Sequence, residues 1–349
     1  MPWKLQRQPS LNLTTMNMRK FACFLPAFLF CVWVFAQNDT TYADRLGFPK
    51  GARVVILHVD DAGMSYDSNE GVVQAISQGV ARSTSVMMPC PWVPGFVHWL
   101  KEHPNTDAGL HLTLTSEWRD YRWTALSGKP KVPGLIDTEG AMWHSVEDVV
   151  KHASPDEVET EIRAQIERAK SMGFEPTHMD SHMGTLFALP AFTQRYIKLS
   201  IEYHIPVMFP GGHSTLIAQQ LKALAVDLQQ AQAVGKALWA AGLPVIDDIE
   251  NNSYSWSLPA GVEATDENLR KYKTQFYINA LKSVKPGITY VIMHCTATTP
   301  VFQKISDSGP TRRGDLLAMT NPELKSFLDK EGIIVTTFRE LSERRAKLK

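Results

Sequence analysis

From residue 53 onward, apolar runs with the length of buried strands alternate with segments of helical periodicity. Such alternation is typical of parallel sheets whose strands are connected by helices. The predicted strands are 53–61, 83–89, 109–115, 177–183, 207–210, 244–249, 288–295 and 333–338. The predicted helices are 68–80, 94–103, 154–173, 190–203, 215–241, 264–283 and 321–331. The pattern predicts an α/β fold, a single β/α barrel related to the TIM barrel with seven or eight strands that need not be regular. A doubly wound open sheet is the alternative.

The segment 154–173 has the clearest helix ends. Ser154, Pro155 and Glu157 form the pattern of a capping box with proline at the first helical position. Gly173 is suited to end the helix. Loops are predicted at 116–150 and around Arg312, Arg313 and Asp315.

The first 36 residues have the organisation of a secretory signal peptide. Arg19 and Lys20 precede an uncharged run, 21–36, which ends in small residues suited to cleavage after Ala36. This run is shorter than the ~20 apolar residues that a membrane-spanning helix needs. We therefore expect an exported protein, periplasmic or secreted, with an uncleaved N-terminal anchor as the alternative.

The domain limits follow from this interpretation. The signal peptide begins best at Met16 or Met18, so the residues before them are interpreted as a mis-assigned start. A polar linker then covers 37–52, and one domain covers 53–345. No membrane span is predicted in the chain that remains after cleavage.

Composition excludes several classes of protein. Hydrophobic residues make up 44% and charged residues 21% of the 349 residues, which is ordinary for a globular protein. The formal net charge is zero, so there is no basic excess for a phosphate backbone, and nucleic acid is not an expected partner. Beyond the signal peptide the only cysteines are Cys90 and Cys295, which predict either one disulfide or two buried thiols.

Ionisable residues stand on or directly after three of the predicted strands, where a barrel of this kind opens into its active site. Asp60 and Asp61 end the first strand, and two adjacent carboxylates are costly to bury without a partner. His111 lies on the face of its strand opposite the leucines; by itself it fits a hydrogen-bonded core histidine better than a ligand. His294 ends the apolar run of another strand and is a candidate proton donor, because imidazole titrates near neutral pH.

A fourth group has three ionisable residues at a spacing of two. His178, Asp180 and His182 share one face of a strand, and the two histidines would also share a face of a helix. Two imidazoles with a carboxylate from elsewhere suit zinc and leave a position open for water. A hydrogen-bonded polar core is the alternative explanation.

Taken in order, these motifs resemble the YdjC/ChbG family of carbohydrate deacetylases. The matching segments are HVDDAGMSYDSNEGVVQAISQGVARSTSVMM, GLHLTLT, THMDSH and VIMHC, and the resemblance covers about 53–340. It implies a β/α barrel akin to the polysaccharide deacetylases, a divalent metal ion (zinc or magnesium) and an N-acetylated carbohydrate as substrate. Two departures, Ala62 in place of phenylalanine and the Met183-Gly184 pair after His182, concern the substrate and leave the implied ligands intact.

The resemblance also implies roles for individual residues. The metal ligands would be Asp61, His111 and His182. Asp60 would be the general base and His294 the acid, while Asp180 and His178 would lie behind the ligands and orient them. Substrate contacts are expected from Trp118, Tyr121, Trp123 and Arg312, with a lid that packs on the barrel as the alternative for the aromatic loop.

The implied reaction is hydrolysis of an acetamide to acetate and a free amine. One alternative is a glycoside hydrolase that pairs Asp60 with Asp180 or Asp248. Another is an exported sugar-binding protein that keeps the fold without turnover.

Overall fold

The structure is a computed structural model that describes residues 40–220 and 227–348. Parallel strands form one sheet in the order β4-β3-β2-β1-β6-β5, and β7 pairs with β1. The strands are β1 (Arg53–Ala62), β2 (Ser83–Val86), β3 (Asp107–Leu112), β4 (Met179–Ser181), β5 (Asp248–Glu250), β6 (Gly287–Met293) and β7 (Ile334–Val335). The predicted α/β class with a parallel sheet is confirmed.

The two edges of this sheet are linked to each other. Met179 of β4 forms an isolated parallel bridge with Val207, and Pro210 forms another with Ile246, just before β5. One short segment can reach both edges only if the sheet curls. The predicted strand at 207–210 is therefore present as these two bridges alone.

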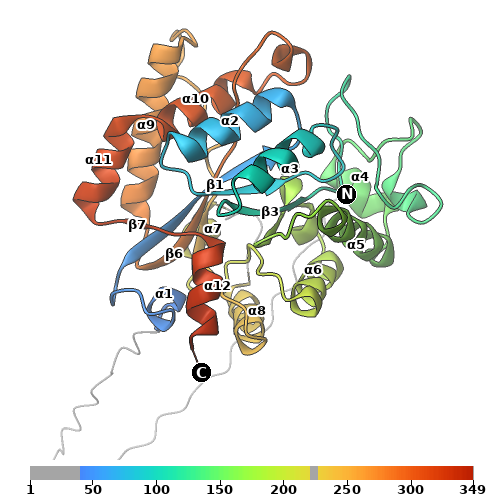
Figure 1. Ribbon diagram of the computed structural model, residues 1–349, viewed down its shortest axis with the longest axis horizontal. Helices are drawn as coiled ribbons and strands as arrows, with labels where there is room; N and C mark the ends of the chain where they lie inside the picture. The colour runs from blue at the N-terminus through green and yellow to red at the C-terminus, as the bar shows by residue number, and fades with distance from the viewer. Residues whose placement is uncertain (1–39, 221–226, 349) are drawn as a thin grey trace, which may run out of the picture. The chain divides into compact units, whose positions relative to one another are not determined.

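Helices cover the outside of the curled sheet (Figure 1). They are α1 (Tyr42–Arg45), α2 (Tyr66–Ser77), α3 (Val93–Glu102), α4 (Val146–His152), α5 (Pro155–Ser171), α6 (Pro190–Tyr203), α7 (Thr215–Gln220), α8 (Leu228–Ala240), α9 (Asp266–Ser283), α10 (Gly309–Met319), α11 (Pro322–Glu331) and α12 (Phe338–Ala346). Short 3-10 turns are η1 (Pro133–Leu135), η2 (His182–Phe187) and η4 (Phe302–Lys304). The capping box at Ser154 and Glu157 is present as predicted, since both of its hydrogen bonds form.

Several predicted elements differ from the structure. The loop expected around Arg312 is helix α10. Its proline lies in the first turn, where proline is tolerated, and packing against α9 and α2 outweighs the low helix propensity of its glycines. The last predicted strand is two residues long and gives way to α12, which Thr337 caps through the amide of Glu340. The helix expected at 215–241 is two helices, α7 and α8, and residues 221–226 between them lie outside the described part.

The structure tests only part of what was predicted for the N-terminal region, because the described residues begin at residue 40. The signal peptide lies outside the described residues, and none of the described helices has both the length and the apolar character to cross a bilayer. Part of the predicted linker is docked on the domain, since the amides of Tyr42 and Ala43 donate to the Asp247 carboxylate. Cys90 and Cys295 are two buried free thiols, as one of the two alternatives predicted.

The close packing around β3 leads to a first prediction, about the effect of a side chain at Gly109. A Cβ atom at Gly109 would lie 2.6 Å from the ring and the carbonyl oxygen of His178. We expect Gly109→Ala to lower the free energy of unfolding by roughly 1–3 kcal/mol, because the strand cannot move away from its neighbour. Gly95 in α3 has no atom within 4 Å of the same position, so Gly95→Ala should be neutral or stabilising. Urea unfolding of both variants measures this, and equal midpoints would contradict it.

Candidate active site

The residues predicted at the ends of four strands lie close together, on the side of the sheet where the carboxyl ends of the strands are found. Asp60 and Asp61 lie at the end of β1, His111 lies in β3, and His182 and His294 directly follow β4 and β6. All are buried except His294, which is partly exposed. The meeting follows from the parallel topology, since the carboxyl ends of parallel strands point to the same side.

Three of these side chains converge on one point. Ligand atoms of Asp61, His111 and His182 all lie within 4.8 Å of one another. The Asp61 Oδ1 atom is 3.3 Å from His111 Nε2 and 3.5 Å from His182 Nδ1, and the two nitrogens are 3.1 Å apart. Asp61 Oδ1 is buried without a hydrogen-bond partner. An unpartnered carboxylate oxygen facing two imidazole nitrogens is a donor set that a divalent metal ion would satisfy.

The far atom of each of these groups has its own partner. His111 Nδ1 lies 2.6 Å from Asp180 Oδ1, and Asp61 Oδ2 accepts a 2.6 Å hydrogen bond from Arg312. His182 Nε2 lies 3.1 Å from both carboxylate oxygens of Glu117. The sequence analysis did not single out Glu117, since no motif or periodicity distinguishes it from other loop acids.

The charges in the cluster stabilise one another. Burial alone would raise the pKa of Asp61, but Arg312 and the two histidines hold that pKa well below its usual value. Burial alone would lower the histidine pKa values. Asp60 and Asp180 instead raise the pKa of His111 well above its usual value, and Glu117 with Asp61 raises the pKa of His182 to about 9. These carboxylates favour protonation of the imidazoles, so a metal ion would compete with protons for their nitrogens.

Asp60 and His294 face each other beside this cluster. His294 Nε2 lies 3.7 Å from Asp60 Oδ2, and Asp60 Oδ1 is buried without a hydrogen-bond partner. Burial, followed by the charge of Arg312, lowers the pKa of His294, so its neutral form is favoured. The ring of Tyr254, which the sequence analysis also missed, lies 4.9 Å from the His294 ring and is 48% exposed. The arrangement places the Asp60 carboxylate, an imidazole whose neutral form is favoured and an exposed aromatic ring close together.

Comparison with known proteins identifies the chain's family. A sequence profile described as YdjC-like protein matches residues 54–330. The chain belongs to the YdjC-like family. A carbohydrate deacetylase of Thermus thermophilus is 30% identical over 285 residues, which are 82% of this chain and 92% of that protein. A carbohydrate deacetylase of Thermoanaerobacter pseudethanolicus is 23% identical over 286 residues, or 82% and 98% of the two chains.

A solved structure supports the fold of this YdjC-like chain. A protein of Enterococcus faecalis, to which cleavage of cellobiose phosphate is provisionally ascribed, superposes with a TM-score of 0.65 at 19% identity. The match covers 83% of this chain and 99% of that one. This match supports the α/β fold, while the profile match confirms the family resemblance inferred from the motifs.

His178 lies deeper in this YdjC-like fold than the resemblance implied. Its ring stacks on Phe338 at 4.4 Å and meets His58 edge-on at 5.0 Å, away from the three converging groups. Burial lowers its pKa to about 4. Two residues along a strand shift a side chain by roughly 6.6 Å, so His178 lies one layer below Asp180. It packs the core and does not orient a ligand directly.

The residues expected to contact substrate have other partners. Arg312 is 2% exposed and its guanidinium is held by Asp61. Trp123 is buried and donates to the carbonyl of Thr115, and Tyr121 donates to the carbonyl of Met64. These contacts favour the alternative of a loop packed over the strand ends; Trp118, which is half-buried, is the remaining aromatic candidate.

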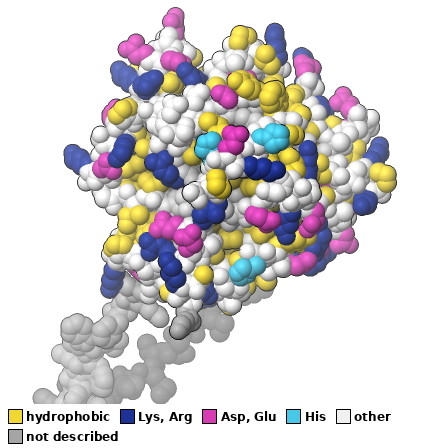
Figure 2. All heavy atoms as spheres, in the orientation of Figure 1, with side chains coloured by type: hydrophobic (Ala, Val, Ile, Leu, Met, Phe, Trp, Pro, Cys, Tyr) yellow, Lys and Arg dark blue, Asp and Glu magenta, His cyan; other side chains and the backbone are white. Residues whose placement is uncertain are grey.

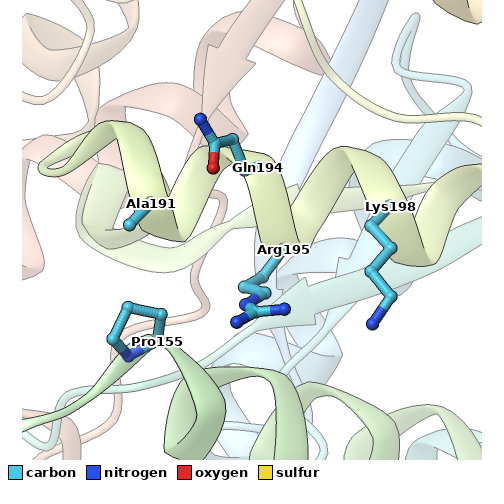
Figure 3. A pocket seen from close by; sticks show the side chains of 5 residues that line it. All are labelled: Pro155, Ala191, Gln194, Arg195 and Lys198. Carbon is cyan, nitrogen blue, oxygen red and sulfur yellow. The ribbon is translucent and has the colours of Figure 1, made fainter.

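On the described part of the outer surface, Asp137, Glu139 and His144 form another group of possible ligands, but all three contact the guanidinium of Arg122. A hollow between α5 and α6 is lined by Pro155, Ala191, Gln194, Arg195 and Lys198 (Figure 3). Its cations are paired, since Arg195 bonds Asp156 and Glu159, and Lys198 bonds Glu159. On the face shown in Figure 2, basic and acidic side chains are interspersed. The chemistry of this protein is therefore expected at the strand ends.

The Arg312–Asp61 pair makes a second prediction. We expect Arg312→Met to lower the free energy of unfolding of the metal-free protein by roughly 3 kcal/mol, because the buried Asp61 carboxylate loses its strongest cation. The neighbouring Arg313 pairs with the more exposed Asp266, so Arg313→Met should cost less than about 1 kcal/mol. Urea unfolding in the presence of a chelator compares the two, and similar losses would argue against a buried ion pair.

Proposed function

We propose that this YdjC-like protein is a metal-dependent deacetylase that removes acetyl groups from N-acetylated sugars. The observation that carries the proposal is the convergence of Asp61, His111 and His182 on one point, with Asp61 Oδ1 unpartnered. Relatives named carbohydrate deacetylase, matched over most of their length, support the same reaction. The products would be acetate and a free amino sugar.

Asp61, His111 and His182 would hold the metal ion. Two imidazole nitrogens with one carboxylate oxygen favour zinc, and the oxygen ligand also suits magnesium. When bound, the ion supplies a Lewis acid that polarises the acetyl carbonyl and lowers the pKa of water. The protein's own part is to hold the three groups at fixed positions before the ion arrives.

Asp60 is proposed as the general base. Its Oδ1 atom has no hydrogen-bond partner and lies 3.2 Å from His58 Nε2. A proton taken from the attacking water would go to Asp60, and the water oxygen would bond to the acetyl carbon. Its neighbour Asp61 is unsuited to this role, because Arg312 and the histidines stabilise its ionised form.

His294 is proposed to deliver a proton to the leaving amine. Burial and Arg312 favour its neutral form, so it must first receive a proton, and Asp60 lies 3.7 Å away to pass one on. A low pKa makes the protonated ring a strong acid, which suits donation to the amine nitrogen as the C–N bond breaks. The proton that left the water thus ends on the amino sugar.

The competing glycoside hydrolase reaction lacks a free second carboxylate. Asp180 already bonds His111 and Tyr290, and its pKa is held well below its usual value in spite of burial. Asp248 accepts hydrogen bonds from the amides of Leu216 and Ile217. Both carboxylates are thus engaged by other groups of the protein, whereas glycoside cleavage needs a second carboxyl group that can act on the sugar.

Two further features belong to the proposal. A single closed barrel is supported by the bridges at Met179 and Pro210, which link the two sheet edges. Export is supported by the basic residues and the uncharged run within the first 36 residues.

Acetate release tests the proposed reaction. The protein without its first 36 residues should release acetate from N-acetylglucosamine oligosaccharides, lose this activity with EDTA and regain it with added zinc or magnesium. Absence of acetate from a protein shown to hold metal would contradict deacetylation of these sugars.

Asp60→Asn should lower kcat by roughly 10²–10⁴-fold while its metal content is unchanged, because it removes only the proton acceptor. Loss of metal in that variant would indicate that Asp60 is a metal ligand and not the general base.

Tyr254 makes a prediction about substrate binding. We expect Tyr254→Ala to lower kcat/KM roughly tenfold at most, because an exposed ring beside His294 can stack on a sugar. Tyr66 is matched in exposure at 48% but contacts Trp92, so Tyr66→Ala is the control and should leave kcat/KM unchanged. Steady-state kinetics on the same oligosaccharide distinguishes the two variants. An equal effect of both would count against a specific role for Tyr254.

A further inference from the structure

Each of the three converging groups has one atom directed at the centre and another held from behind. Asp180 holds His111 at Nδ1, and Arg312 holds Asp61 at Oδ2. The third group, His182, has Nδ1 toward the centre and Nε2 toward a carboxylate. That carboxylate belongs to Glu117, which follows β3 and has no other side-chain partner among the described residues.

We propose that Glu117 is a positioning residue that sets the ring orientation and the tautomer of His182. Both of its oxygens lie 3.1 Å from His182 Nε2, so this nitrogen carries the proton and donates to the carboxylate. Nδ1 then keeps a lone pair, which faces the point where Asp61 and His111 also converge and where the proposed metal ion would bind. A carboxylate behind a metal-binding imidazole restricts its rotation and increases its basicity. The inference rests on the proposed metal site.

His182 needs such a contact more than His111 does. His111 is inside β3, where ladder hydrogen bonds to both neighbouring strands hold the backbone. His182 is the first residue after β4, and the next residue, Met183, has a left-handed φ of 52°. The backbone therefore leaves the strand at His182. The His182 side chain is only 5% exposed, and side-chain contacts largely determine the orientation of its ring.

The backbone on both sides of Glu117 is itself held in place. The amide of Ser116 donates to the Trp143 carbonyl at 2.8 Å, and the amide of Trp123 donates to Ser116 Oγ at 3.0 Å. Glu117's own carbonyl lies 3.3 Å from His144 Nδ1. The loop between β3 and α4, at the right of Figure 1, thus carries a group that acts on the metal site as well as covering it.

Metal affinity, measured separately from turnover, tests this role. Glu117→Ala should weaken binding of zinc or cobalt(II) by roughly 10–100-fold in competition with a chelator, because His182 loses its orienting partner. Glu117→Gln, which keeps a neutral hydrogen-bond acceptor, should lie between Glu117→Ala and the unaltered protein. The visible spectrum of bound cobalt(II) should change in Glu117→Ala, since one imidazole is no longer fixed.

The control is Asp120→Asn in the same loop, where the carboxylate is exposed and bonds Arg119. It should match the unaltered protein in affinity and spectrum. Without metal, all variants should keep a cooperative unfolding transition, with a lower midpoint in Glu117→Ala because the buried His182 loses a charged partner. Unchanged affinity and spectrum in Glu117→Ala would overturn the inference, and so would a general loss of fold. If the unaltered protein itself binds no divalent ion, the proposed metal site fails first, which separates the two results.

Discussion

The carboxylate of Asp180 connects four strands of the sheet. Its Oδ1 atom lies 2.6 Å from His111 Nδ1 on β3, and its Oδ2 atom accepts a 2.8 Å hydrogen bond from Tyr290 on β6. The same Oδ2 atom is 3.1 Å from His58 Nε2 on β1. A buried charge is tolerated only when it is paired in this way, so the relative positions of β1, β3, β4 and β6 are tied to this one side chain. The positions of the converging ligand atoms therefore depend on Asp180, which bonds His111 directly.

The atoms left without partners are as informative as those that are paired. In the described part of the chain, the buried unpartnered atoms of the candidate site are Asp60 Oδ1, Asp61 Oδ1 and His294 Nδ1. Deeper in the core, His58 and Asp180 are fully bonded. Unsatisfied polar atoms are costly in a folded protein. Such atoms also occur elsewhere, for example His178 Nε2 in the core, but the two carboxylate oxygens lie beside imidazole nitrogens, where a bound ion or water would satisfy them. The same cost explains why Arg312, a long cation, is buried against Asp61 instead of facing a substrate.

Much of the fold could be predicted because local physics decided it. The strand β1, the capped helix α5 and the helix α6 follow from apolar runs, capping residues and periodicity, and their observed bounds lie within two residues of the predicted ones. The helix α10 could not be predicted, since its glycines disfavour a helix and packing against α9 and α2 stabilises it. For the same reason the extent of the short strands was overestimated. Whether a residue pairs with a neighbouring strand depends on what lies beside it.

The sequence by itself determined which residue types stand at the strand ends and in what order, and thereby the family. A period of two and a parallel topology bring Asp61, His111 and His182 to the same edge. Only the tertiary structure decided what lies behind each of them. Arg312, Asp180 and Glu117 come from a helix, a neighbouring strand and a loop. Such partners are chosen by distance and desolvation in the folded chain, and those quantities have no period along the sequence.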